Sequence, residues 1–174
     1  MRHQGTAVVL ALATLLTLTG CALPAPLIGK ATPSMTSTYP TPDETREKML
    51  AIVEATRTLI GGTDWEIQGD SYSGCPLGDG SEGAEYIRQE GIIRTVLDAK
   101  ALSKKIADLW ESHGYHGVTI KPLPDPIPGF DITYGMDANR VLLTVTITDY
   151  SATIHVSGGC IPGDSSDLTN ALVE

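Results

Sequence analysis

Apolar residues recur at a helical period in two stretches of the chain. In the first, they return every three or four residues from Pro42 onward, until the glycine pair 61–62 ends the pattern. Thr41 precedes this run, and Glu44 follows Thr41 by three residues. This spacing is the pattern of a capping box. The sequence therefore predicts an amphipathic helix over 42–60. Its core-facing stripe consists of Met49, Ile52, Val53, Thr56 and Ile60.

The second helical pattern follows Asp98, a residue type that caps helix N-termini. Gly114 ends this pattern, and His113 stands in the last turn, where an imidazolium interacts favourably with the helix dipole. A second amphipathic helix is therefore predicted between Asp98 and Gly114. Its apolar stripe comprises Leu102, Ile106, Leu109 and Trp110.

Elsewhere apolar and polar residues alternate, which predicts β-strands. Two strands precede the second helix, and a turn-rich loop at 73–83 joins them. We expect a β-bulge at Gly91 in the second of these strands. Four strands follow the second helix, and short connections make the last three an antiparallel meander. The predicted strands cover 65–69, 84–95, 118–120, 130–136, 141–147 and 152–156.

The order of the predicted elements is helix, two strands, helix, four strands. A sheet needs its apolar face covered, and two amphipathic helices would cover it. We therefore expect an α+β fold: a single, mostly antiparallel, twisted sheet of about six strands, with two amphipathic helices packed on one face. The sequence leaves the order of the strands open.

The N-terminus adds a targeting signal to this picture. A basic start precedes an apolar run over 7–18, which matches the apolar region of a secretory signal and is shorter than the roughly 20 residues of a membrane span. The sequence Leu18-Thr19-Gly20-Cys21 that follows resembles the lipobox of bacterial lipoproteins. This resemblance implies that residues 1–20 are a signal peptide and that Cys21 carries a diacylglyceryl group. The alternative is a secreted protein that is cleaved elsewhere and keeps a spare thiol at Cys21.

The expected mature chain has two parts. Residues 21–41 are rich in Pro, Thr and Ser without a helical or strand period, so we expect the lipidated cysteine to be followed by a flexible tether. Residues 42–174 are expected to form a single globular domain. The net charge of −9 makes nucleic acid and anionic membrane surfaces poor partners. The membrane partner is therefore reached through the anchor on Cys21, which places the protein on the outer, exported face of the cell membrane.

Two cysteines remain once Cys21 is lipidated, and both lie in a chain that is expected to be exported. Disulfides persist outside the cytoplasm, so we expect Cys75 to pair with Cys160. The alternatives are a zinc site or a catalytic cysteine, but no histidine lies near either residue in the sequence.

Several segments of the chain resemble the LppA-like lipoproteins of mycobacteria. The segments are the lipobox, the 65–78 stretch that contains Gly74-Cys75-Pro76, and Gly159-Cys160-Ile161-Pro162. The likeness spans most of the mature chain. It implies an envelope location and the Cys75–Cys160 bond, and it brings no catalytic residues with it.

No catalytic pattern stands out in the mature chain. It lacks the Gly-x-Ser-x-Gly turn of many serine hydrolases, and His113 and His116 have no third ligand nearby to complete a metal site. We therefore expect no cofactor, no metal and no catalytic residue. The prediction is a non-enzymatic envelope protein that binds a lipid, a glycan or a protein partner through residues that the sequence does not identify. The alternative is a hydrolase of cell-wall polymer with a carboxylate pair such as Glu85 and Asp131.

Overall fold

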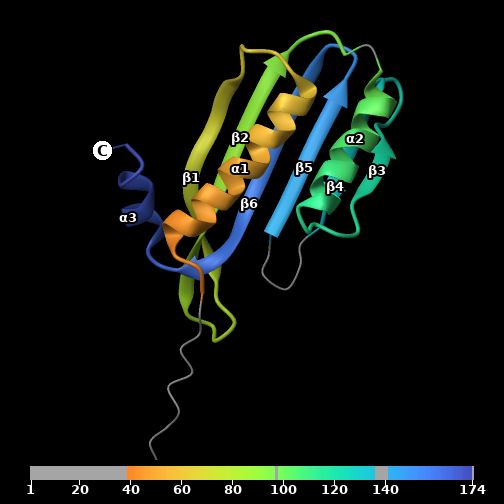
Figure 1. Cartoon of the computed structure of the whole chain (residues 1–174). Helices are drawn as coiled ribbons and strands as arrows, with labels where there is room; N and C mark the ends of the chain where they lie inside the picture. Colours follow the sequence, from red (N-terminus) through yellow and green to blue (C-terminus); the bar gives the residue numbers. More distant parts are fainter. Residues whose placement is uncertain (1–38, 97, 136–140, 174) are drawn as a thin grey trace, which may run out of the picture. The chain divides into compact units, whose positions relative to one another are not determined.

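Three helices and six strands make up the part of the chain that the computed structural model describes, residues 39–96, 98–135 and 141–173 (Figure 1). These elements belong to one compact unit, and they confirm the predicted α+β class. In chain order they are α1 (Pro42–Ile60), β1 (Glu66–Pro76), β2 (Glu82–Ile93), α2 (Ala99–Ser112), β3 (Thr119–Pro122), β4 (Gly129–Tyr134), β5 (Val141–Thr148), β6 (Ser151–Pro162) and α3 (Ser165–Asn170).

The strands form one antiparallel sheet in the order β1-β2-β6-β5-β4-β3. The predicted meander is confirmed, because β4 pairs with β5 and β5 pairs with β6. The last strand, β6, also pairs with β2, so it joins the two halves of the sheet through its centre. A Pro-rich connection follows β3, which is short and lies at the edge of the sheet. At an edge, a proline without a backbone N–H removes no hydrogen bond between strands.

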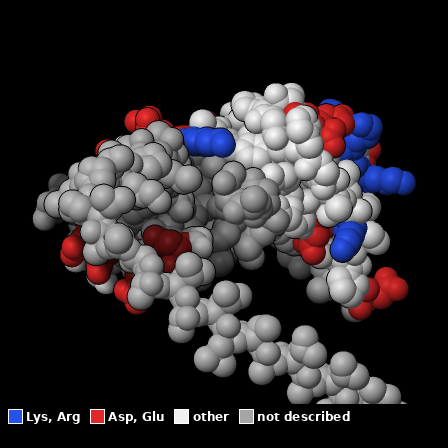
Figure 2. All heavy atoms as spheres, turned by 90° about the horizontal axis from the view of Figure 1, so that it is seen from below, with Lys and Arg blue, Asp and Glu red and all other residues white. Residues whose placement is uncertain are grey.

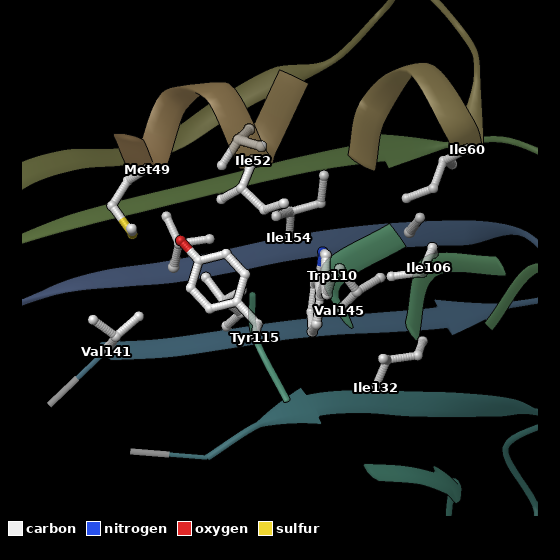
Figure 3. Close-up of a cluster of buried hydrophobic side chains, with 14 of the residues drawn as sticks. Met49, Ile52, Ile60, Ile106, Trp110, Tyr115, Ile132, Val141, Val145 and Ile154 are labelled. Carbon is white, nitrogen blue, oxygen red and sulfur yellow. The ribbon is translucent and has the colours of Figure 1, made fainter. Parts of the chain in front are cut away.

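Helices α1 and α2 lie on the same face of the sheet, α1 over β2 and β6 and α2 over β3, β4 and β5 (Figure 1). Figure 3 shows the core between these layers. Ile52 from α1 and Trp110 from α2 point toward Val145 and Ile154 of the central strands. Every member of the predicted stripe of α1 is buried, which confirms the helical reading of that pattern.

The helix ends follow the predicted capping chemistry. At the start of α1 the Glu44 N–H donates to Thr41 Oγ1 over 3.2 Å, and the Thr41 N–H donates to Glu44 Oε2 over 2.8 Å. The bond from the Thr41 N–H, and then the Thr41 side chain, lower the pKa of the Glu44 carboxyl group, because they favour its charged form. At the start of α2 the Asp98 carboxylate accepts from the Ala101 N–H over 2.8 Å. Both predicted N-caps are therefore confirmed.

The hairpin of β1 and β2 is longer than the sequence predicts. Most of the expected loop at 73–83 belongs to the two strands, and the turn between them is closed by two backbone hydrogen bonds between Leu77 and its neighbours Gly80 and Ser81. Likewise β6 continues to Pro162, so Cys160 lies inside the last strand instead of after it. These Gly- and Ser-rich ends lack alternation, and they become strands because a neighbouring strand offers backbone partners.

The bulge predicted at Gly91 is wrong. The register shifts lie between Ile67 and Gly69 on β1 and between Glu85 and Ile87 on β2, whereas Gly91 pairs with Thr153 in regular register. The glycine instead gives space to a side chain of the neighbouring strand. A Cβ at position 91 would come within 2.4 Å of Nε2 of Gln68, the extra residue of the β1 bulge.

Helix α3 is not predicted by the sequence. Its six residues are too few to show a period, although Asp164 caps it through the N–H groups of Ser166 and Asp167. The helix packs on the edge strand β1. There the Tyr72 N–H donates to Thr169 Oγ1 over 2.9 Å, so α3 occupies part of the open edge of the sheet.

The lipobox, Cys21 and the tether up to residue 38 lie outside the described residues, so their predictions stay predictions. None of the helices in the described ranges is long and apolar enough to cross a membrane.

Candidate functional site

A groove of about 720 Å³ lies at the end of the molecule where α1 begins. Its volume is in the range of about 300–1,000 Å³ that is common for ligand sites. The walls come from the start of α1, the turn after β1, the start of β5 and the end of β6. The lining residues are Tyr39, Pro40, Glu44, Thr45, Lys48, Pro76, Leu77, Gly78, Val141, Gly158, Gly159, Cys160 and Ile161.

Thr45 provides a buried polar group in this mostly apolar groove. Its residue is only 3% exposed, and its hydroxyl has no hydrogen-bond partner among the described residues. Its methyl group faces β6, because a Cβ at Gly158 would come within 2.6 Å of Thr45 Cγ2. The Oγ1 atom is enclosed by its neighbours in this structure, so a ligand could bond to it only if the Thr45 side chain turned toward the groove. Such a bond would recover the roughly 1–3 kcal/mol that an unpaired buried hydroxyl costs.

Lys48 provides the positive charge of the groove. It lies one helical turn after Thr45, and of the described lining residues it alone is a Lys or Arg. Its Nζ lies 5.6 Å from the centre of the Tyr115 ring. No described carboxylate lies within ion-pair distance of this Nζ. The nearby Glu44 instead uses its carboxylate to cap α1.

Charge is unevenly distributed around this end of the molecule (Figure 2). In this view from below, Lys and Arg side chains gather mainly on the right, where acidic side chains alternate with them. The described residues of β1, its turn into β2, and α3 include no Lys or Arg. Lys48 is therefore a local positive charge beside an acidic part of the surface.

The predicted disulfide forms part of the groove wall. Cys75 on β1 and Cys160 on β6 are bonded, with their Cα atoms 6.0 Å apart, and Cys160 lines the groove. Gly83 on the intervening strand β2 leaves room for the bond. A Cβ at Gly83 would come within 3.0 Å of Cys160 Sγ and 2.6 Å of the Ile161 carbonyl oxygen.

Removing this disulfide is expected to destabilise the domain. The bond closes a separation of 85 residues, and loss of a native disulfide of this kind costs about 2–5 kcal/mol. The double variant Cys75→Ala/Cys160→Ala should therefore unfold at a lower urea concentration than the parent. Equal midpoints for the double variant and the oxidised parent would show that the bond adds no net stability.

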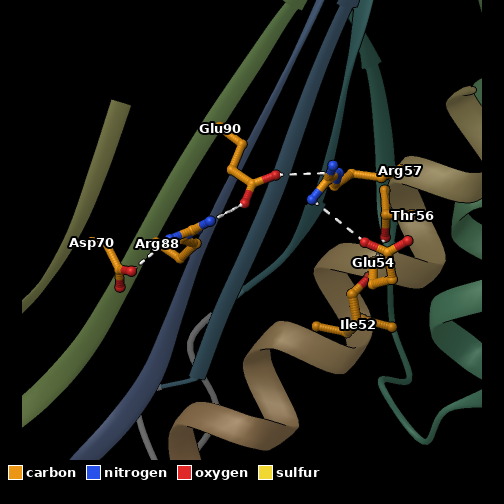
Figure 4. A network of polar contacts seen from close by, with 7 residues as sticks. All are labelled: Ile52, Glu54, Thr56, Arg57, Asp70, Arg88 and Glu90. Carbon is orange, nitrogen blue, oxygen red and sulfur yellow. Dashed lines mark hydrogen bonds and ion pairs between the residues drawn. The ribbon is translucent and has the colours of Figure 1, made fainter. Parts of the chain in front are cut away.

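A second polar cluster lies between α1 and the sheet, away from the groove (Figure 4). Arg88 on β2 pairs with Asp70 on β1 and donates from Nε to Glu90 Oε1 over 2.7 Å. Glu90, which is 1% exposed, faces Arg57 of α1 with 3.4 Å between Oε2 and Nε. Arg57 also pairs with Glu54 on its own helix. We call these five residues the buried charge chain.

The pKa values of its members and neighbours favour fixed protonation states. Burial raises the pKa of Tyr86, and its hydrogen bond to Asp70 adds to the effect. Burial by itself would lower the pKa of Arg88, but the hydrogen bond and charge of Glu90 and the charge of Asp70 outweigh it and raise that pKa. These groups keep their protons over the physiological range, which suits a structural link between α1 and the sheet.

The two carboxylates considered for a hydrolase do not come together. Glu85 lies on β2 and accepts from Ser157 over 3.1 Å, whereas Asp131 lies on β4 and accepts from Thr146 over 2.7 Å. Strands β6 and β5 separate them, which places their backbones at least about 14 Å apart at the usual strand spacing. Glycosidase pairs are separated by about 5–9.5 Å, so this pair does not match either geometry.

The histidines are also dispersed. His113 caps the C-terminus of α2, His116 lies in the following loop, and His155 lies on β6 opposite Thr144 and Gln89. Across the described ranges no three His, Cys, Asp or Glu side chains are grouped closely enough to hold a metal ion.

Most of the aromatic residues belong to the core and do not form a binding surface. Tyr72 and Tyr115 are buried, and Tyr115 packs edge to face against Tyr134 with 5.2 Å between ring centres. Trp65 packs under the guanidinium of Arg57. Tyr150 remains exposed, in the turn between β5 and β6.

The groove residues were not identified by the sequence analysis, because four separate segments supply them. One signal was present. Thr45 lies one turn before Met49 on the apolar stripe of the predicted helix, where a polar side chain needs a reason to be buried.

No protein-family model matches the sequence, and no curated protein matches it. Among solved structures, the fold is similar to the crystal structure of a DUF4853 family protein from Actinomyces odontolyticus. The TM-score is 0.47 at 15% sequence identity, and the match covers 69% of this chain and 64% of that protein. The matched part thus spans less than two thirds of that protein's length.

Proposed function

We propose that this chain is a lipid-anchored protein of the cell envelope that binds a ligand in the groove and catalyses no reaction. The observation that carries the proposal is the groove itself, on whose wall Thr45 has a buried hydroxyl without a partner among the described residues. A polar group kept unpaired inside an apolar groove costs stability in the free protein. That cost is understandable if the hydroxyl pairs with a ligand.

The proposed anchor is a diacylglyceryl group on Cys21, on the outer face of the cell membrane. The lipobox pattern supports it, and so does the Cys75–Cys160 bond, because disulfides persist in exported proteins. Each buried methylene contributes about 0.8 kcal/mol, so two acyl chains hold a protein far more stably than one. The mycobacterial LppA-like family is proposed on the sequence resemblance alone.

The non-enzymatic reading is supported by where the acidic residues lie. Glu85 and Asp131 are too far apart for a glycosidase pair, and Asp70 and Glu90 are engaged in the buried charge chain. A ligand-binding role uses the groove without needing a reactive group. The cell-wall hydrolase is therefore the weaker of the two candidate functions.

Anchoring is tested by phase partitioning of the exported full chain. The wild type is expected to enter the detergent phase of a membrane extract, and Cys21→Ala is expected to leave it, because only the wild type carries acyl chains. Cys21→Ala protein that still partitions with detergent would contradict the anchor.

Ligand binding is tested by capture from an envelope extract. The mature chain is purified gently and its organic extract is compared with that of Leu77→Asp, which puts a charge on the half-buried groove wall. The matched control is Ile93→Glu, a change at a side chain that is 89% exposed and outside the groove. A co-purified molecule should be present in the parent and the control and absent from Leu77→Asp. Equal recovery from all three would contradict a groove ligand.

A further inference from the structure

We infer that the ligand of the groove is an amphiphile with an anionic head, held at that head by Lys48 and Thr45. The inference rests on the proposed function and adds the chemical class of the ligand. It places the apolar body of the amphiphile along the wall that Leu77, Val141 and Ile161 form.

The two polar residues are arranged to meet one head group. Thr45 and Lys48 are three residues apart on α1, so they lie on neighbouring positions of the same helix face. Both line the groove. The hydroxyl of Thr45 is enclosed and has no partner among the described residues, and once its side chain turned toward the groove it would donate a hydrogen bond to a carboxylate or phosphate oxygen. A hydrogen bond to a charged acceptor is stronger than one to a neutral acceptor, which favours an anion.

The position of Lys48 favours an anion for a separate reason. Its ammonium group has no carboxylate partner within the described residues, although the chain carries a net charge of −9. The lining carboxylate, Glu44, already accepts from the Thr41 N–H at the helix cap. Charges screen over about 8 Å at physiological salt, so a head bound beside Lys48 experiences that positive charge strongly.

The rest of the groove suits an apolar body. Leu77, Val141 and Ile161 come from three different elements and line the same space, with the disulfide at Cys160 beside them. Burying an acyl chain there contributes about 25 cal/mol for each Å² of apolar surface removed from water. The head group then fixes the orientation of the chain.

The probes are palmitate and hexadecanol, which share a long apolar chain and differ in the charge of the head. Binding is measured by calorimetry below the concentration at which either probe aggregates. The protein begins at residue 22, so that it contains every described element and carries no acyl chain of its own. We expect palmitate to bind about tenfold more tightly than hexadecanol, which corresponds to one charged hydrogen bond.

Two variants test the two head-group contacts. Lys48→Met keeps the length of the side chain and removes its charge, and it should bring the affinities for palmitate and hexadecanol within about twofold of each other. The control Lys105→Met removes an exposed charge from α2, outside the groove, and should keep the tenfold preference. Thr45→Val should weaken palmitate binding about threefold to tenfold. Without a ligand, Thr45→Val should melt at the same temperature as the parent or higher, because an unpaired buried hydroxyl is removed.

Three results would overturn the inference. The first is a preference for palmitate that survives in Lys48→Met. The second is tighter binding of hexadecyltrimethylammonium than of palmitate by the parent protein. The third is no binding of palmitate, which includes the case where residues 22–38 or a second copy of the chain fill the groove. Hexadecanol binding that Leu77→Asp abolishes, without any preference for charge, would leave the proposed function standing and remove only the anionic head.

Discussion

Replacing Arg88 by Met is expected to lower the free energy of unfolding by about 3–5 kcal/mol, the usual cost of breaking a buried ion pair. Arg88 is 7% exposed and lies between the carboxylates of Asp70 and Glu90. Glu90 is 1% exposed, and without Arg88 it keeps only Arg57 among the described residues, at 3.4 Å. A urea titration of the parent and the variant measures the difference.

The double variant Arg88→Met/Glu90→Leu is the decisive control. It replaces both buried charges by apolar side chains, and Arg57 keeps its pairing with Glu54. Replacement of a whole buried pair is often neutral or stabilising, so the double variant should be more stable than Arg88→Met alone. The single variant Glu90→Leu completes the comparison. A double variant that loses as much as Arg88→Met and Glu90→Leu added together would show that the two charges do not interact.

Replacing Trp110 by Ala is expected to cost about 3–5 kcal/mol, as for other large buried aromatic residues. Trp110 is 1% exposed and packs where α1, α2 and the sheet meet (Figure 3). Its Nε1–H donates to Thr56 Oγ1 over 3.0 Å, and the Thr56 hydroxyl in turn donates to the Ile52 carbonyl over 2.7 Å. The variant loses both the packing and the first of these bonds. The midpoint of thermal or urea unfolding reports the loss.

Two further variants separate the contribution of buried packing from that of the hydrogen bond. Trp110→Phe keeps most of the ring and loses the hydrogen bond, so it should be destabilised by less than Trp110→Ala. Tyr150→Ala removes an aromatic ring that is 60% exposed and should change stability by less than about 0.5 kcal/mol. Comparable losses in Trp110→Ala and Tyr150→Ala would contradict the assignment of Trp110 to the core.

The helices α1 and α2 were predictable because the information for each is local. The cap at Thr41, the apolar stripe that contains Met49 and the terminating glycine pair 61–62 all lie within one stretch of sequence. The same holds for Asp98 and Trp110 in α2. The meander of β4, β5 and β6 was also predictable, because short connections favour pairing between consecutive strands.

The errors occurred where a residue's role depends on a distant neighbour. Gly91 looks like a bulge in the sequence, but it pairs in regular register, and the side chain of Gln68 on another strand packs over it. The strand ends around Gly74 and Gly159 lack alternation, and only the facing strands make them extended. Helix α3 is a short segment that depends on a distant strand, because Thr169 forms hydrogen bonds with the backbone of Tyr72 on the edge strand β1.

The α+β class, the two long helices and the pairing of Cys75 with Cys160 could all be predicted from the sequence, which also predicts the anchor at Cys21. These features rest on the period of apolar residues, on the helix caps and on the number of cysteines, all of which are visible along the sequence. The strand order, the buried charge chain and the groove lined by Thr45 and Lys48 became visible only in the folded chain. Each of these depends on which distant segments meet, and β6 brings them together by pairing with β2 and β5 at the centre of the sheet.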